Sequence, residues 1–176
     1  MRLEYGEINP LAPAELSRFG FIVGTWRCEA RLKRDESHWE TLRASWVGRY
    51  VLDGWAIADE YRMSTASGEL LVLGLNVRAY DGEKKVWNMK WLNGFSGAWT
   101  DLGPEELGGV TADEKSITLI MKEPVAGHGF TRATYTNFSE NHFTWRGERS
   151  CDRKTWEEFL VVECYRIQDS LEHSDS

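Results

Sequence analysis

Asp59 is one of two candidates for acid–base chemistry in this sequence. It is adjacent to Glu60, and neighbouring residues on a β-strand face opposite sides, so only one of the two carboxylates can face a protein interior. Asp59 has the same parity as Trp55 and Tyr61, which favours it as the inward-facing residue. We therefore predict Asp59 as a candidate general acid or base, although exposure is the commoner fate of a single carboxylate.

Glu148 is the second candidate of this kind. It follows Arg146 by two residues, so on a strand the two side chains share one face and could pair to orient a polar ligand atom. Ion pairs of this spacing are also common on exposed surfaces, where they contribute little. Both readings of Arg146 and Glu148 stay open at this stage.

Asn76 and Arg78 alternate with an apolar series along the segment 73–80. If the apolar series packs outward, Asn76 and Arg78 point into the interior and offer a fork that binds a carboxylate or carbonyl group. If the apolar series faces inward, Arg78 is simply solvated. The apolar series is Leu73, Leu75, Val77 and Ala79.

Aromatic residues are abundant and favour an apolar pocket. The chain has nine Trp, and Trp87, Met89 and Trp91 share one face of the segment 86–92. Aromatic rings and a flexible thioether are typical of an adaptable binding cavity, with an ordinary filled core as the alternative. The residues predicted to line the cavity are Trp55, Tyr61, Trp87, Trp91, Trp99 and Trp145, with Asn76, Arg78 and Arg146 as polar contacts.

Metal, cofactor and nucleophile motifs are not evident. The four His show no pairing at i, i+2 or i, i+4, so we expect no metal site. His128, in a Gly-flanked segment, is a weak haem-ligand alternative, and otherwise we predict no cofactor. The three Cys, at 28, 151 and 164, are widely spaced and are expected to be reduced thiols. The sequence has neither a Gly-X-Ser-X-Gly elbow nor a glycine-rich phosphate loop.

The charge of the chain limits its partners. The net charge is -7, and the basic face that phosphate binding needs is missing, so we expect neither nucleic acid nor an anionic membrane as a partner. The N-terminus lacks the pattern of a secretory signal and no stretch is long enough to span a membrane, which predicts a cytoplasmic protein. A homodimer is one possibility.

The elements that must position these residues are mostly strands. Two Asp-Gly turns, at Asp53-Gly54 and Asp81-Gly82, separate alternating segments and predict two successive hairpins. A short helix is expected within residues 10–20, before the first strand. The predicted strands are 26–32, 46–52, 55–63, 71–80, 86–92, 116–121, 129–138, 142–149 and 155–167.

This pattern predicts one all-β domain over residues 1–176, with a lead-in at 1–20 and a flexible tail at 168–176. Consecutive hairpins favour an antiparallel up-and-down barrel of about eight to ten strands, because closure removes exposed sheet edges. A sandwich of two sheets is the alternative.

Several sequence blocks resemble a known family. Gly24-Thr25-Trp26 after a lead-in helix is similar to the signature of lipocalins and the wider calycin superfamily. The segments 51–61, 76–81 and 143–156, with Tyr165-Arg166, resemble a bacterial family of uncharacterised calycin-like proteins, the DUF1579-type group. This chain departs from that family at Arg153-Lys154, where the family usually has Gly.

The resemblance implies a lipocalin-like barrel, an inward-facing Arg78 and a cation–π contact of Arg166 over Trp26. It implies little about activity, because one fold hosts many functions.

Three functional hypotheses follow. The first is a binding module whose interior holds a small hydrophobic or aromatic molecule, optionally one with a carboxylate. The second is an enzyme that uses Asp59 or Glu148 beside Arg78 in the same pocket for isomerisation, cyclisation or hydrolysis of a hydrophobic substrate. The third is a filled barrel that acts through its surface. The first is favoured.

Overall fold

The computed structural model describes residues 5–102, 110–112, 115–121 and 129–167. In that part of the chain, one 3-10 helix, η1 (Ala14–Ile22), precedes eleven strands that form a single sheet. The strands are β1 (Gly24–Lys33), β2 (Trp39–Val51), β3 (Ala56–Ser64), β4 (Leu70–Asp81), β5 (Val86–Asn93), β6 (Trp99–Asp101), β7 (Val110–Ala112), β8 (Ser116–Ile120), β9 (Phe130–Thr136), β10 (His142–Ser150) and β11 (Glu157–Arg166).

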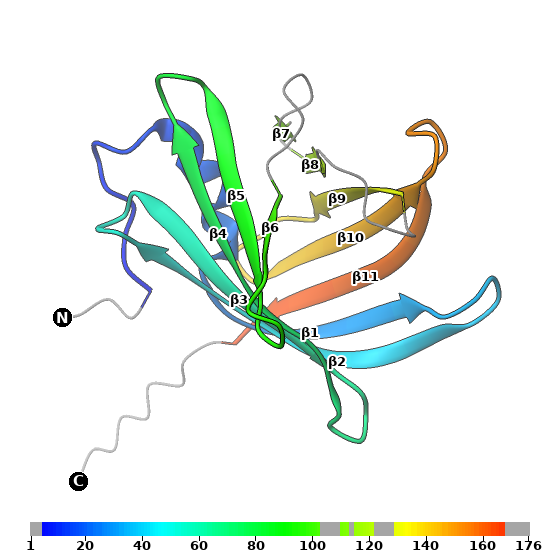
Figure 1. Ribbon diagram of the computed structural model, residues 1–176. Coiled ribbons are helices and arrows are strands. Elements are labelled where there is room, and N and C mark those ends of the chain that lie inside the picture. Colours follow the sequence, from blue (N-terminus) through cyan, green and yellow to red (C-terminus); the bar gives the residue numbers. More distant parts are fainter. Residues whose placement is uncertain (1–4, 103–109, 113–114, 122–128, 168–176) are drawn as a thin grey trace, which may run out of the picture.

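The sheet order is β6-β5-β4-β3-β2-β1-β11-β10-β9-β8-β7, and every pair of neighbouring strands is antiparallel. Each neighbouring pair is also consecutive in sequence, except β1 and β11, which join the two halves of the sheet. The sheet curls strongly around its inner face, with β6 and β7 at its two edges (Figure 1). The predicted all-β, lipocalin-like fold with a short N-terminal helix is confirmed, as a curled half-barrel and not as two stacked sheets.

The two Asp-Gly hairpins form as predicted. Between β2 and β3, Leu52 and Asp53 both have φ of 52° and Gly54 has φ of 85°. Glycine tolerates this left-handed region without strain, and Asp is among the residues that adopt it most readily. The turn fixes the register that places Trp46 opposite Tyr61 and Gly48 opposite Asp59.

β1 illustrates how alternation builds the core. Its burial pattern alternates from Gly24, so that Trp26, Cys28 and Ala30 are buried while Arg27 and Glu29 are exposed. Burial on one face with charge on the other is the mark of a half-buried strand. This strand was predicted from the same alternation.

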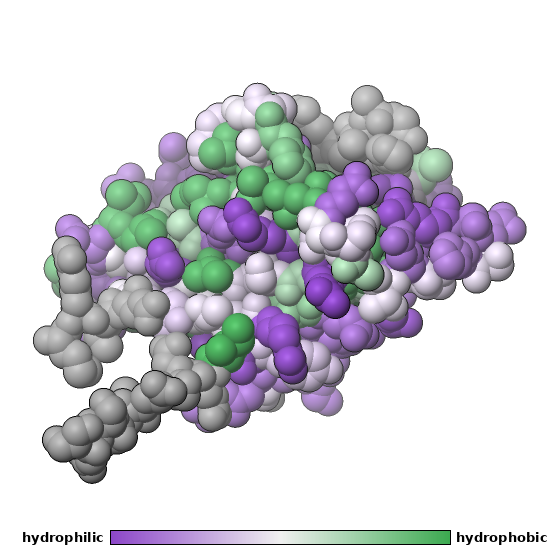
Figure 2. Space-filling view, turned by 90° about the horizontal axis from the view of Figure 1, so that it is seen from below, coloured by the Kyte–Doolittle hydropathy of each residue, from purple (hydrophilic) through white to green (hydrophobic). Residues whose placement is uncertain are grey.

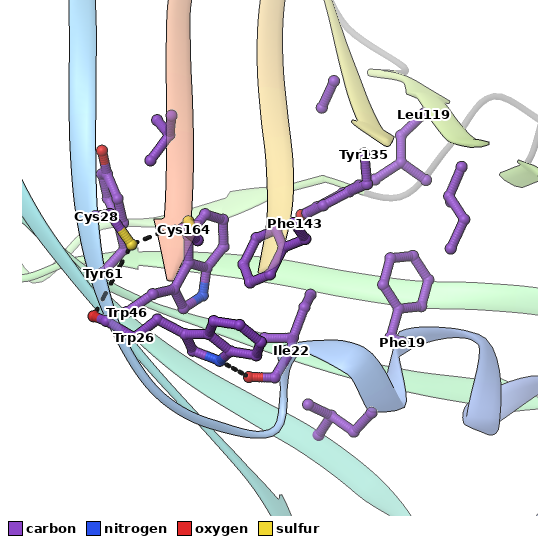
Figure 3. Packing of buried hydrophobic residues seen from close by; sticks show 14 of the residues in the cluster. Phe19, Ile22, Trp26, Cys28, Trp46, Tyr61, Leu119, Tyr135, Phe143 and Cys164 are labelled. Carbon is purple, nitrogen blue, oxygen red and sulfur yellow. Dashed lines mark hydrogen bonds between the residues drawn. The ribbon is translucent and has the colours of Figure 1, made fainter. Parts of the chain in front are cut away.

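The helix η1 packs at the end of the sheet where β1 begins. The Trp26 indole Nε1 donates a hydrogen bond to the Ile22 carbonyl at 2.8 Å, and the Trp26 side chain is fully buried (Figure 3). On its other side, the Arg166 guanidinium lies 4.1 Å from the centroid of the Trp26 ring, which confirms the predicted cation–π contact. Trp26 is thus a structural plug at this end.

Among the described residues, no helix has both the length and the apolar character needed to cross a membrane.

Candidate functional site

The inner face of the curled sheet encloses a cavity of about 390 Å³. Met89 and Trp91 on β5 and Leu119 on β8 line the same space, so the two ends of the sheet approach each other across it. The lining is predominantly apolar. It consists of Trp46, Tyr61, Val72, Asn76, Arg78, Met89, Trp91, Leu102, Leu119, Met121, Thr131, Ala133, Tyr135, Trp145, Phe159, Leu160 and Val162.

Two polar residues of the lining, Arg78 and Tyr135, lie beside η1, against Phe19. Arg78 pairs across the β3–β4 hairpin with Ile57, near the start of β3, and lies over the ring of Phe19 in η1 at 5.3 Å. At the opposite end of the strands, Val72, Thr131 and Phe159 are half-buried. The cavity therefore has a closed, polar end beside η1 and a mostly apolar end towards solvent, where Thr131 is a polar lining residue.

Asp59 is the centre of the polar network. It is fully buried, and three donors meet its carboxylate. Arg78 forms an ion pair through Nη1 to Oδ1, and Oδ2 accepts hydrogen bonds from Trp46 Nε1 at 2.6 Å and from Asn76 Nδ2 at 2.9 Å. A buried charge is tolerated only with such partners, so Asp59 and Arg78 compensate each other.

Arg78 extends the network across the cavity to the other half of the sheet. Its Nη2 donates a hydrogen bond to the Tyr135 hydroxyl on β9 at 3.1 Å. β4 points Gly74, Asn76 and Arg78 inward and its apolar series outward, so of the two orientations left open by the sequence, the inward one is observed.

Gly74 shapes the wall beside this network. A Cβ atom at this position would come within 2.5 Å of three atoms of the Trp91 indole, the nearest at 2.0 Å, so the ring lies directly over the glycine. Trp91 lies on β5 and lines the cavity together with Leu119 on β8. The missing side chain of Gly74 leaves room for that ring.

Tyr61 also lines the cavity, but its hydroxyl is buried and has no hydrogen-bond partner among the described residues. Burial raises the pKa of Tyr61 far above its usual value, and the nearby Cys28 and Cys164 thiols raise this pKa further. The Cys28 and Cys164 sulfur atoms lie 2.9 Å apart, directly opposite each other on β1 and β11 (Figure 3). Both cysteines are free thiols, as expected from the sequence.

The other predicted aromatic residues divide between the lining and positions outside it. Trp145 is among the lining residues. Trp87 is buried, but packs against Phe19 in an edge-on contact at 4.9 Å and does not line the cavity. Trp55 and Trp99 are 44% and 56% exposed and lie outside the lining. Figure 2 shows one face of the molecule, on which hydrophobic and hydrophilic side chains are mixed.

Arg146 and Glu148 do not meet each other or the cavity. Glu148 accepts two hydrogen bonds of 2.7 Å from Arg132, through Nε and Nη2. Arg146 pairs with Glu158 on β11 at 3.2 Å. Arg132 lies directly opposite Glu148 on β9, whereas Arg146 reaches Glu158 diagonally on β11. Among the described residues, the hydrogen-bond and ion-pair partners of Glu148 include neither Arg78 nor Asp59.

Sequence reasoning missed Trp46 and Tyr135, which complete the network. Trp46 could have been found, because the Asp53-Gly54 turn sets the register that places it across from Tyr61. Tyr135 lies on β9, in the half of the sheet that reaches β4 only through the β1–β11 junction. No local pattern indicates that long-range contact.

No group of three or more His, Cys, Asp or Glu in the described part of the chain could hold a metal ion. His128, the residue considered as a haem ligand, lies outside the described residues.

Comparisons with known proteins support the fold. No protein-family model matches the sequence, and a search of curated proteins finds none with significant similarity. Among solved structures, Rv2717c from M. tuberculosis is similar, with a TM-score of 0.54 and 10% identity over 89% of this chain and 99% of that chain. The structure of EF1p2_mFAP2b bound to DFHBI has a TM-score of 0.44 and 11% identity, over 86% of this chain and 99% of that one, which is too distant to support an argument. The chain thus shares a barrel-like fold with Rv2717c.

Proposed function

We propose that this protein binds a small hydrophobic or aromatic molecule inside the curled sheet. The observation that carries the proposal is the cavity of about 390 Å³, apolar over most of its lining and polar at one end. Ligand sites in proteins are typically concave, of about 300–1,000 Å³, and mostly apolar with a few placed polar groups. The Trp91 and Trp145 rings supply flat surfaces for an aromatic body, and Met89 adapts to its shape.

The charge balance favours a neutral ligand over a carboxylate. Arg78 was a candidate carboxylate-binding residue, but its guanidinium already pairs with Asp59 inside the protein. A second carboxylate in the cavity would have to give up its hydration without finding an uncompensated positive charge. The acid–base alternative finds no comparable support, because the Asp59 carboxylate is held by three donors and Glu148 is paired on the outer face.

The proposal includes the finer assignment of the chain as a cytoplasmic, bacterial calycin of the DUF1579 type. The set of sequence blocks described above and the lipocalin-like sheet support the family part of this assignment.

Intrinsic tryptophan fluorescence tests the proposal directly. Trp46, Trp91 and Trp145 line the cavity, so a panel of aromatic, fatty and terpenoid compounds should include at least one that quenches the emission with saturation. A flat response across the panel would contradict the proposal.

Replacing each of two alanines by methionine tests where in the protein the ligand binds. Ala133 is 2% exposed and lines the cavity, whereas Ala79 lies on the outward face of β4. Ala133→Met should fill part of the cavity and weaken binding by about tenfold or more, which corresponds to about 1.4 kcal/mol. Ala79→Met is the matched control and should leave the dissociation constant unchanged. Equal effects of the two substitutions would place the ligand elsewhere.

A further inference from the structure

The direction of each hydrogen bond in the buried network determines which donors and acceptors are left to bind a ligand. The network runs without interruption from Asn76 through Asp59 and Arg78 to Tyr135. Two of its members, Asn76 and Tyr135, line the cavity together with Arg78. The question is which donors and acceptors remain after the internal bonds are made.

Tyr135 is left with a donor. A guanidinium has five N–H donors and no acceptor, so in the bond from Arg78 Nη2 the Tyr135 oxygen must be the acceptor. The hydroxyl proton is therefore not used in that bond. The described residues give this hydroxyl no other hydrogen bond, so its proton remains to be donated.

Asn76 is left with an acceptor. An ionised carboxylate only accepts hydrogen bonds, so Asp59 requires the amide nitrogen of Asn76 to face it, which fixes the orientation of the amide. The amide oxygen Oδ1 then points away from the carboxylate, and the described residues provide no donor to it. The side chain is only 8% exposed, so this acceptor is not simply solvated on the surface.

The network contributes no net charge to the closed end of the cavity. Arg78 and Asp59 are 3% and 0% exposed and carry opposite charges in direct contact. Water cannot screen either charge well at this depth, so each is balanced by the other. A ligand group placed here meets the Tyr135 donor and the Asn76 acceptor, beside the Arg78 guanidinium, in an overall neutral environment.

On the basis of the proposed function, we infer that the ligand is a neutral phenol or alcohol whose hydroxyl group occupies the closed end. The hydroxyl oxygen accepts from Tyr135 and the hydroxyl proton is donated to Asn76 Oδ1. A hydroxyl is the smallest group that both donates and accepts. The apolar remainder of the ligand lies along Trp91, Met89 and Trp145 towards the open end.

Isothermal titration calorimetry with four naphthalenes of matched shape tests this inference. The probes are 2-naphthol, which donates and accepts, 2-methoxynaphthalene, which only accepts, 2-methylnaphthalene, which does neither, and 2-naphthoate, which is anionic. Each hydrogen bond should improve the dissociation constant by about three- to tenfold. The expected order of affinity is 2-naphthol, then 2-methoxynaphthalene, then 2-methylnaphthalene, with 2-naphthoate the weakest.

The same series separates this inference from the proposed function. If none of the four probes binds but the fluorescence panel yields a ligand, the hydroxyl assignment fails and the proposed function stands. If neither the probes nor the panel yields a ligand, both proposals fail. If 2-naphthol and 2-methylnaphthalene bind equally, the cavity binds aromatic molecules but the hydroxyl assignment is wrong. If 2-naphthoate binds best, the charge of Arg78 is available to ligands and the inferred neutral class is overturned.

Two tyrosine variants assign the donor. Tyr135→Phe should abolish the advantage of 2-methoxynaphthalene over 2-methylnaphthalene, because only the hydroxyl is removed. Tyr61→Phe is the matched control, since Tyr61 lines the same cavity but its hydroxyl lies outside the network. That variant should keep the advantage. Loss of the advantage in Tyr61→Phe, or its persistence in a folded Tyr135→Phe protein, would contradict the assignment.

Discussion

The Asp59–Arg78 and Glu148–Arg132 pairs join the same chemical groups in opposite surroundings. In the interior pair, the carboxylate and guanidinium side chains are 0% and 4% exposed. In the outer pair the corresponding values are 19% and 27%, and two hydrogen bonds of 2.7 Å connect the groups. Water reaches the outer pair and can replace either partner, whereas the interior pair is buried and held by other protein groups.

The difference lies in what each carboxylate needs from its neighbours. Asp59 receives two further donors, Trp46 and Asn76, in addition to Arg78. Glu148 is held by Arg132 alone among the hydrogen bonds of the described residues. Burial makes a carboxylate depend on several fixed partners, and those fixed partners then give the cavity a defined polar end. The outer Glu148–Arg132 pair positions no further hydrogen-bonding group around its carboxylate.

The largest expected effect comes from breaking the interior pair. Arg78→Met should reduce the free energy of unfolding by about 3–5 kcal/mol, because it leaves the Asp59 charge buried without its counter-charge. Urea unfolding followed by tryptophan fluorescence measures the loss. The double variant Asp59→Leu/Arg78→Met should be more stable than Arg78→Met alone, since no charge is then left unpaired.

The outer pair provides the control for that measurement. Arg132→Met removes an arginine of the same kind from Glu148 and should cost much less than Arg78→Met. Arg132 also stacks on the Trp156 ring at 4.5 Å, so part of its cost is lost packing. If Arg132→Met and Arg78→Met destabilise the protein equally, burial does not distinguish the two pairs and the comparison fails.

The sequence predicts the surroundings of the interior Asp59–Arg78 pair better than those of the outer Glu148–Arg132 pair. Alternation favours Asp59 as inward-facing and puts Asn76 and Arg78 on one face, whose inward direction only the family resemblance favoured; the two Asp-Gly turns set the strand pairing. Parity does not identify partners, however. The same reasoning placed Arg146 and Glu148 on one face, but each forms its ion pair with a residue of an adjacent strand, Arg146 with Glu158 and Glu148 with Arg132.

Aromatic residues show the other limit of sequence reasoning. Trp91 and Trp145 line the cavity, but Trp55 and Trp99, which have the same side chain, are exposed. Trp55 directly follows the turn at Gly54 and Trp99 begins the short edge strand β6, so neither is covered by a strand on both sides. Coverage depends on the long-range arrangement of the sheet, and composition does not reveal it.

A smaller effect distinguishes two hydroxyl groups inside the cavity. Tyr135→Phe should destabilise the protein by about 1–2 kcal/mol, because Arg78 Nη2 loses its acceptor while buried. Tyr61→Phe should leave the stability unchanged or raise it by up to about 1 kcal/mol, because the hydroxyl it removes is buried and has no partner. Thermal unfolding of both variants against the wild type measures this difference. A loss of similar size in both would mean that Tyr61 has a partner in solution.

The pKa of Tyr61 adds a pH dependence to the same variant. Its pKa is raised in the folded protein, so the folded state keeps the proton more tightly than the unfolded state. The resulting stability is present below the normal pKa of a tyrosine, about 10, and is lost as the pH rises above it. Tyr61→Phe should therefore show a shallower loss of stability between neutral and strongly alkaline pH than the wild type. Identical alkaline profiles would contradict the burial of this hydroxyl.

The smallest effect is expected for Glu148→Gln on the outer face. Glutamine has the size of glutamate and can still accept one hydrogen bond from Arg132 through its amide oxygen, so the charge and one of the two hydrogen bonds are lost. Partly exposed pairs contribute about 0–1 kcal/mol, and salt screens them, so the difference from the wild type should shrink between low and high sodium chloride in urea unfolding. The affinity for 2-naphthol should not change, because Glu148 does not line the cavity. If the substitution abolishes ligand binding in a protein of normal stability, the outer face takes part in function, and the division between a functional interior pair and a merely structural outer pair is wrong.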